Sequence, residues 1–178
     1  PYLMSGEGED WEKVVFGECY KGMIYSGSEV DITEHNVRVL ARTCAKLGYD
    51  VLRPAFVPDY LKALQIAKRI APELLVMGST GGTLGIPDGS SMSEIVKRVY
   101  TELGAVAREM GERVAGSIEG IRMQVDAGAD AVVDCTDFCL KQGPFFKPSI
   151  YKDLIFPHLK RMVDAAHKMG IFFVMHTD

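Results

Sequence analysis

The sequence lacks the features that mark several special classes of protein. No apolar run approaches the roughly 18 residues that a membrane-spanning helix needs, so we expect no membrane association. Lys and Arg number 20 against 24 Asp and Glu, and they are scattered, so no nucleic-acid partner is expected. Four cysteines in 178 residues are too few for a disulfide scaffold. A reducing, cytoplasmic location is therefore expected.

The composition is that of one folded globular domain. Hydrophobic residues make up 47% of the chain and charged residues 25%, which excludes intrinsic disorder. The chain starts at Pro1 without Met and stops at Asp178, directly after an apolar run that reads as a strand. Because a buried parallel strand needs neighbours and a covering helix, we expect the sequence to be part of a longer protein.

A pattern of helix, Gly or Pro, and apolar run repeats along the chain. Gly after the last turn is a common helix C-cap, and Pro cannot continue a helix. The stops are Gly48, Pro72, Gly128 and Gly170, and the apolar runs that follow predict strands at residues 50–56, 73–79, 130–135 and 171–176. Apolar residues at helical spacing predict helices over residues 33–47, 93–110, 112–127 and 157–169.

Alternation of helices with continuously apolar strands is typical of an α/β protein with a parallel sheet covered on both faces. We predict a TIM (β/α)₈ barrel, present as a partial barrel of about four βα units. Residues 33–178 form the N-terminal part of this single domain, truncated at its C-terminus. Residues 1–32 are predicted to be irregular, with a strand in Glu12–Tyr20 and a loop or hairpin at Gly22–Ser28.

An open, doubly wound sheet would show the same alternation. It would carry a Gly-rich turn that runs straight into a helix. The candidate segment, Gly78–Gly85, does not match GxGxxG and is followed by a loop, so a dinucleotide site is disfavoured. This segment is either a tight bend or a place where the backbone approaches a bulky ligand closely.

In both architectures the active site lies at the C-terminal ends of the strands. This rule selects one group of residues for catalysis, another for substrate binding and a third for metal binding. Asp134, Asp137 and His176 are the candidate catalytic residues. Phe56, Thr80, Gly81 and Gly82 are the candidate substrate-binding residues. His176 and Asp178 are the candidate metal ligands.

The chemistry of these residues leaves alternatives open. His176 is a metal ligand with Asp178, an acid–base group oriented by that carboxylate, or a buried histidine satisfied by the backbone. Asp134 and Asp137 would bind an N–H-bearing or cationic substrate, or act as acid and base, unless one of them caps the following turn. Cys135 and Cys139 are not spaced as a C-x₂-C zinc pair, and Cys19 and Cys44 read as core residues.

The second half of the chain resembles the uroporphyrinogen decarboxylase superfamily. The resemblance is carried by Ala127-Gly128-Ala129-Asp130, Asp134, Asp137, Lys147–Tyr151, Phe156-Pro157, Met169-Gly170 and His176. Met77–Gly85 is similar to the glycine turn that follows the preceding strand in this family. The resemblance extends over roughly residues 34–178. It implies a (β/α)₈ barrel of about twice this length.

The resemblance implies one of two chemistries. The decarboxylases bind a tetrapyrrole without metal or cofactor, through an aspartate and several arginines. The corrinoid-dependent methyltransferases hold zinc through a His-x-Cys pair and move a methyl group between a small substrate and cobalamin on a partner protein. In this sequence His176-Thr177-Asp178 stands in place of His-x-Cys, and Asp is a competent zinc ligand. The first 37 residues contain no Arg, which counts against the decarboxylase.

We therefore expect a zinc-assisted methyltransferase that uses a small-molecule methyl donor or acceptor and a corrinoid-binding protein. The zinc would polarise the heteroatom that carries the methyl group. The alternative is porphyrinogen decarboxylation by a carboxy-lyase of porphyrin biosynthesis. A third hypothesis is a non-catalytic binding or assembly module, which the polar strand ends disfavour. A homodimer is among the expected assemblies.

Overall fold

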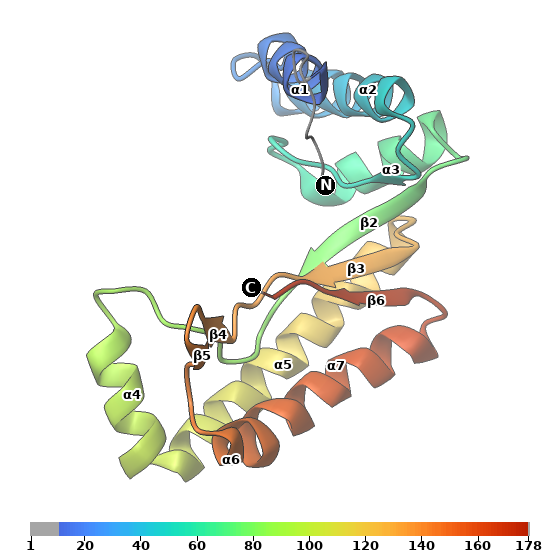
Figure 1. The fold of residues 1–178 in the computed structure, drawn as a ribbon. Helices are drawn as coiled ribbons and strands as arrows, with labels where there is room; N and C mark the ends of the chain where they lie inside the picture. Colours follow the sequence, from blue (N-terminus) through green and yellow to red (C-terminus); the bar gives the residue numbers. More distant parts are fainter. Residues whose placement is uncertain (1–10, 178) are drawn as a thin grey trace. The chain divides into compact units, whose positions relative to one another are not determined.

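The computed structural model describes the backbone of residues 11–177 and the side chains of residues 17–177. The chain divides into two compact units. Unit 1 contains the residues up to Met77 together with Ala127–Ala129, and unit 2 contains Gly78–Asp126 and the residues from Asp130 onward. Figure 1 shows the helices and strands of both units. No helix in the described part of the chain is long and apolar enough to cross a membrane.

Four strands form a sheet with parallel pairing, as the sequence predicts for an α/β protein. The strands are β1 (Val51–Leu52), β2 (Leu75–Thr80), β3 (Ala131–Asp134) and β6 (Phe172–Met175), hydrogen-bonded in the order β1-β2-β3-β6. In unit 1, β1 pairs with β2 in parallel from Val51 opposite Leu75. In unit 2, β3 and β6 run parallel from Ala131 opposite Phe172 to Asp134 opposite Met175. The carboxyl ends of β3 and β6 therefore lie together.

Two details of the strands differ from the prediction. β1 ends at Leu52 instead of Phe56, because Pro54 offers no N–H to a ladder and Phe56 adopts a left-handed backbone with φ 56°. β3 is buried along its whole length, as expected for a covered strand. β6 is not covered on both faces, since Phe172 is 66% exposed and β3 is the strand it pairs with among the described residues.

Unit 1 contains three helices. Helix α1 (Trp11–Gly22) replaces the strand predicted in Glu12–Tyr20, so residues 1–32 are not irregular where the structure describes them. Helix α2 (Glu29–Leu47) starts at the N-cap Ser28, whose hydroxyl accepts from the Asp31 N–H, and it ends at Gly48 in the left-handed region. Helix α3 (Tyr60–Ile70) is capped by Asp59. The loop predicted at Gly22–Ser28 is confirmed for residues 23–27, since Gly22 ends α1 and Ser28 is the N-cap of α2.

The strand predicted in Glu12–Tyr20 is wrong, because tertiary packing stabilises a helix there. Cys19 of α1, Met23 directly after it and Val39 of α2 are buried in one small cluster, so this tertiary contact outweighs the β propensity of the segment. A second apolar cluster of unit 1 joins α2, α3, β1 and β2. Cys44 lies in it, so both Cys19 and Cys44 are core residues as predicted.

In unit 2 the boundary between two helices differs from the sequence prediction. Helix α4 (Met92–Thr101) and helix α5 (Leu103–Asp126) meet at Glu102, whereas the predicted boundary is Gly111. Gly111 stays inside α5 because Met110 and Val114 continue one buried face through it. Packing of that face outweighs the helix propensity that a Gly loses, about 1 kcal/mol.

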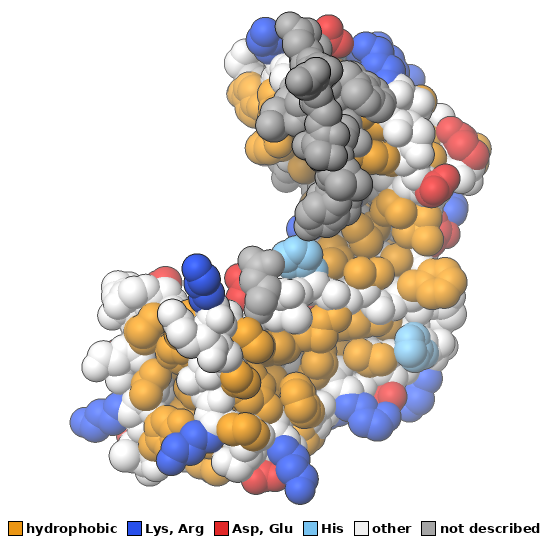
Figure 2. Space-filling model, viewed as in Figure 1, with side chains coloured by type: hydrophobic (Ala, Val, Ile, Leu, Met, Phe, Trp, Pro, Cys, Tyr) orange, Lys and Arg blue, Asp and Glu red, His pale blue; other side chains and the backbone are white. Residues whose placement is uncertain are grey.

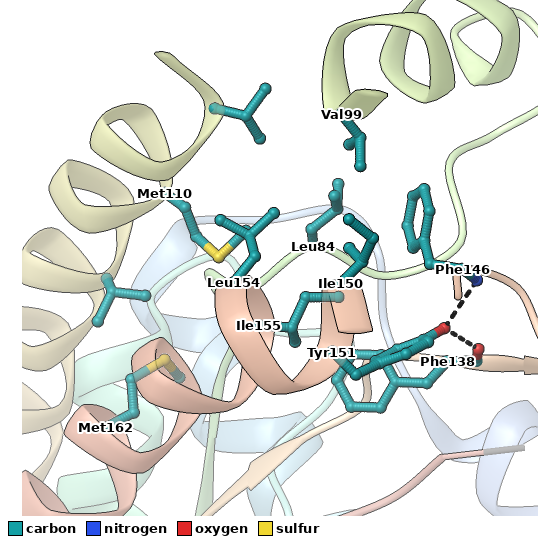
Figure 3. Close-up of a cluster of buried hydrophobic side chains, with 12 residues drawn as sticks. Leu84, Val99, Met110, Phe138, Phe146, Ile150, Tyr151, Leu154, Ile155 and Met162 are labelled. Atoms are coloured by element: carbon teal, nitrogen blue, oxygen red, sulfur yellow. Dashed lines mark hydrogen bonds between the residues drawn. The ribbon is translucent and has the colours of Figure 1, made fainter. Parts of the chain in front are cut away.

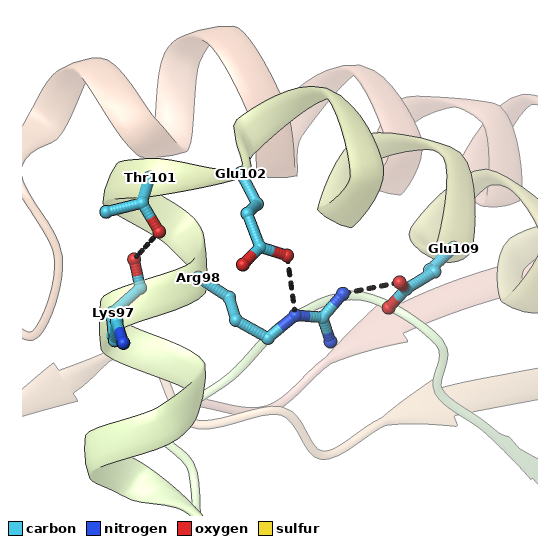
Figure 4. Close-up of polar contacts among 5 residues, drawn as sticks. All are labelled: Lys97, Arg98, Thr101, Glu102 and Glu109. Carbon is cyan, nitrogen blue, oxygen red and sulfur yellow. Dashed lines mark hydrogen bonds and ion pairs between the residues drawn. The ribbon is translucent and has the colours of Figure 1, made fainter.

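Charged side chains join α4 to α5 at the true boundary. The Arg98 guanidinium donates to Glu102 at 3.4 Å and to Glu109 at 2.5 Å, as Figure 4 shows. The hydrogen bond from Arg98 to Glu109 lowers the pKa of the Glu109 carboxyl below its usual value. In the last turn of α4 the Thr101 hydroxyl donates a hydrogen bond to the Lys97 carbonyl at 2.9 Å.

The C-terminal part of unit 2 contains a short hairpin and an interrupted helix. The hairpin pairs β4 (Cys139–Leu140) with β5 (Gly143–Pro144) in antiparallel fashion. Next come α6 (Pro148–Ile150), the π-helical turn η1 (Tyr151–Ile155) and α7 (Phe156–Lys168). Helices α5 and α7 pack side by side on β3 and β6 (Figure 1). Figure 3 shows the largest core cluster, which includes Leu84, Val99, Met110, Tyr151, Ile155 and Met162.

Candidate functional site

The carboxyl end of β3 places Asp134 at the centre of the candidate site. Its side chain is fully buried, at 0% exposure, next to the apolar residues Val132 and Val133 of the same strand. One carboxyl oxygen, Oδ1, accepts a hydrogen bond from the Thr136 hydroxyl. The other, Oδ2, has no hydrogen-bond partner among the described residues. Buried polar atoms are nearly always hydrogen-bonded in folded proteins, so this oxygen is a candidate for contact with a ligand.

Burial raises the pKa of the Asp134 carboxyl above its ordinary value, and the Thr136 hydrogen bond lowers it by a smaller amount. Desolvation penalises the charged form of a carboxyl, so Asp134 holds its proton at a pH where an exposed aspartate is ionised. A neutral carboxyl can donate a proton or a hydrogen bond. The raised pKa is consistent with the predicted role of Asp134 as an acid, which stays a prediction.

The end of β6 lies beside Asp134. The main-chain N–H of His176 donates to the Asp134 carbonyl at 2.9 Å, which extends the β3–β6 ladder by one residue. The Thr177 hydroxyl accepts from the Phe138 N–H at 3.1 Å. The His176 side chain is exposed, so the interpretation as a buried, backbone-satisfied histidine is wrong. Asp178, the predicted partner of His176, lies outside the described residues.

The glycine segment Gly78–Gly85, which begins inside β2, is mostly a packing feature. A Cβ at Gly78 would lie 2.1 Å from Oε1 of Gln124, and a Cβ at Gly82 would lie 2.6 Å from the Ser117 hydroxyl. At Gly85 a Cβ would meet the Thr136 methyl at 2.7 Å. These three glycines let the segment pack closely on α5 and on the loop after β3.

Gly81 differs from these three glycines. The nearest atom to a Cβ at Gly81 is the Asp134 Oδ1, at 4.0 Å, so this position borders the buried carboxyl without being filled. Thr80 precedes it as the last residue of β2 and is half-buried. The predicted residues Thr80, Gly81 and Asp134 thus come together in unit 2, while Gly82 is turned to α5.

Two further predicted residues, Asp137 and Phe56, have exposed side chains. Asp137 is exposed, and its carbonyl accepts from the Ile86 N–H at 2.9 Å, which ties the loop after β3 to the glycine segment. Phe56 belongs to unit 1. It is 50% exposed and contacts Tyr20 with ring centroids 5.5 Å apart. The side-chain amide of Asn36, fully buried, donates to the Phe56 carbonyl at 2.7 Å.

Metal binding requires several ligand side chains close together. Among the described side chains, those of residues 17–177, no three His, Cys, Asp or Glu are arranged to hold a metal ion. The side chains of Cys135 and Cys139 are exposed. The described residues therefore do not form a zinc site around His176, and we derive no chemical step through a metal.

Sequence reasoning missed two residues that shape the site. Gln124 is buried in α5 and clamps Ser79 of β2, accepting from its N–H at 2.8 Å and donating to its carbonyl at 2.9 Å. Thr136 binds the Asp134 carboxyl. A glutamine on an otherwise apolar helix face is the one signal that could have pointed to Gln124, since buried amides are paired.

Parallel strands alternating with helices, and a buried acid at their carboxyl ends, define the chain as an α/β protein of the (β/α)₈-barrel class. The chain belongs to the uroporphyrinogen decarboxylase (URO-D) family, whose family model matches residues 23–178. No individual curated protein matches it. Membership in this family indicates an enzyme, and the four strands correspond to part of the barrel.

Proposed function

We propose that the chain is the catalytic part of a methyltransferase of the URO-D family that passes a methyl group from a small methylated substrate to a corrinoid protein. The buried Asp134 carboxyl carries this proposal. Loss of a methyl group from an ether or amine leaves a basic heteroatom, and that atom needs a proton. Burial raises the pKa of the Asp134 carboxyl, which favours its protonated form and the role of an acid.

The group transfer balances with Asp134 as the acid. The bond between the methyl carbon and the heteroatom breaks, and its electron pair stays on the heteroatom. The corrinoid, as the second substrate, provides the electron pair of the new bond to the methyl carbon. Asp134 gives its proton to the heteroatom and is reprotonated from solvent.

The surroundings of Asp134 support this role. Val132 and Val133 precede it in a fully buried strand, and these apolar surroundings raise the pKa of the carboxyl. Thr136 orients Oδ1, so that Oδ2 is the atom left to donate. Gly81 leaves the space beside the carboxyl without a side chain. The exposed His176 side chain, one residue beyond β6, adds an imidazole at the same end of the sheet.

A methyl-transfer assay tests the proposal. The full chain is mixed with cob(I)alamin and, separately, with methanol, methylamine or anisole, and methylation is followed by the corrinoid absorbance spectrum. Transfer is expected from at least one donor. Asp134→Asn keeps the shape of the side chain but removes the acid, so we expect a rate loss of about 10²-fold or more. Asp153→Asn, an exposed change on η1, is the matched control.

Decarboxylation of a porphyrinogen is the second candidate. The unpartnered Oδ2 of Asp134 favours it, because a carboxyl oxygen can accept the pyrrole N–H groups of a tetrapyrrole. Consumption of uroporphyrinogen without added metal, together with no methyl transfer from the three donors, would replace the first candidate with the second. An Asp134→Asn variant that transfers methyl at the parent rate would remove Asp134 from the mechanism.

A further inference from the structure

The Thr83 hydroxyl of unit 2 has no part in the chemistry described so far. Thr83 is 7% exposed, and its Oγ1 atom has no hydrogen-bond partner among the described residues. Buried hydroxyl groups are nearly always hydrogen-bonded, because burial without a partner costs free energy. Oδ2 of Asp134 is in the same condition. Thr83 Oγ1 and Asp134 Oδ2 are therefore both available to contact a ligand.

The glycine segment connects Thr83 to the surroundings of the buried carboxyl. Gly81, two residues before it, borders this carboxyl, since a Cβ there would lie 4.0 Å from Asp134 Oδ1. Gly85, two residues after it, packs on the loop that follows β3, where a Cβ would lie 2.7 Å from the Thr136 methyl. Thr136 is the residue that donates a hydrogen bond to Asp134. Thr83 thus lies in the chain between two contacts with the Asp134–Thr136 pair.

The backbone around Thr83 is held in place by packing on α5. A Cβ at Gly82 would lie 2.6 Å from the Ser117 hydroxyl oxygen of this helix, so the two elements approach closely. Leu84 is buried in the core cluster that also contains Met110 of α5. A hydroxyl on a backbone that is fixed in this way can contact a ligand with little reorganisation of the protein.

The surface beside β3 is largely apolar. Figure 2 shows hydrophobic side chains gathered over β6, the strand that pairs with β3, and the exposed ones include Phe172, Val174 and Met175. A hydrogen bond in surroundings of low polarity is electrostatically stronger than the same bond in water. A contact between a ligand and the buried Thr83 hydroxyl would therefore contribute more than a contact at an exposed hydroxyl.

We propose that Thr83 is a second catalytic residue, whose hydroxyl donates a hydrogen bond to the heteroatom that loses its methyl group. This inference rests on the proposed methyl-transfer function. In that step the electron pair of the broken bond stays on the heteroatom, so electron density rises there. Asp134 supplies the proton, and the Thr83 hydroxyl supplies a hydrogen bond to the same atom, which stabilises the transition state. No covalent bond of Thr83 forms or breaks.

The stability and the methyl-transfer kinetics of Thr83→Val test the proposal together. Val has nearly the shape of Thr but no hydroxyl. Because the Thr83 hydroxyl has no partner in the protein, the urea midpoint of the variant should equal that of the parent or exceed it. In contrast, kcat should fall about tenfold or more with KM almost unchanged, since the contact acts in the transition state. Thr83→Ser keeps the hydroxyl and should retain most of kcat.

Thr33→Val is the matched control for stability. Thr33 is also buried, but its hydroxyl donates to the Glu29 carbonyl at 2.7 Å. The same change should therefore lower the urea midpoint at Thr33 and not at Thr83. A midpoint that falls as far in Thr83→Val as in Thr33→Val would show that the Thr83 hydroxyl is bonded within the protein, and it would overturn the proposal whichever reaction the chain performs.

The kinetic outcomes separate this proposal from the methyl-transfer function. A parent that methylates cob(I)alamin and a Thr83→Val variant with the same kcat would overturn the role of Thr83 and leave the function intact. A parent that uses none of the three methyl donors would remove the proposed function. Uroporphyrinogen consumption that Thr83→Val slows tenfold would then keep Thr83 as a catalytic residue. Consumption at the parent rate, or the absence of both reactions, would overturn it.

Discussion

The main-chain N–H of His176 donates to the carbonyl oxygen of Asp134 across 2.9 Å. This bond continues the parallel register of β3 and β6 one residue past Met175. It fixes two residues that are 42 positions apart in the sequence at the same end of the sheet. The buried acid and the exposed imidazole are thereby neighbours in backbone position, although their side chains have opposite exposures.

The stability of the protein should depend on the ionisation of Asp134. Because the folded pKa is raised, the stabilising contribution of the neutral carboxyl is complete below the unfolded pKa and is lost as pH rises through the folded pKa. Asn cannot ionise. The free energy of unfolding of Asp134→Asn, relative to the parent, should therefore increase as pH rises above the ordinary pKa of an aspartate. Urea unfolding below and above that pKa measures it, and a flat difference would contradict the burial argument.

The glycine segment allows a matched pair of substitutions. Gly78→Ala places a Cβ 2.1 Å from the Gln124 amide oxygen, so the clamp on Ser79 must shift. We expect a loss of about 1–3 kcal/mol in the free energy of unfolding. Gly81→Ala meets no atom closer than 4.0 Å and should leave stability almost unchanged while slowing turnover at Asp134. Equal destabilisation by both changes, in thermal or urea unfolding, would refute the packing assignment.

Tyr151 should contribute to stability through its hydroxyl. Tyr151→Phe keeps the ring among Phe138 and Phe146 but leaves the buried Phe146 N–H and Phe138 carbonyl without this partner. The expected cost is about 1–3 kcal/mol. Tyr100→Phe, at a 48% exposed tyrosine of α4, is the control and should be near neutral. If the two variants unfold at the same urea concentration, the hydroxyl bridge does not stabilise unit 2.

Zinc binding stays a prediction from the sequence. If His176 and Asp178 are metal ligands, elemental analysis of the full chain should find one zinc, and His176→Ala should lose most of it. His167→Ala changes an exposed histidine of α7 and should retain the metal. Zinc content that is unaffected by His176→Ala would place the metal elsewhere, and no zinc in the parent would end the prediction.

The strand ends were predictable, while the local geometry around them was not. Asp134 and His176 follow continuous apolar runs, and parallel pairing brings such residues to one edge, so their positions followed from the sequence. The neighbours of the Asp134 side chain could not be predicted from the sequence. Thr136 and Gly81 approach it through loop conformations, which have no periodic sequence pattern. The role of Gly78 depends on Gln124, which lies 46 residues away in α5.

The sequence by itself determined the α/β alternation, the parallel sheet and the family, since hydrophobic period and helix-stopping residues are local properties of the chain. Only the tertiary structure decided that residues 12–20 form a helix, that α5 runs through Gly111, and that Asp134 is buried while His176 is exposed. Each of these depends on contacts between distant residues. Packing energy at such contacts exceeds local propensity, and burial, which sets the pKa of Asp134, exists only in the folded chain.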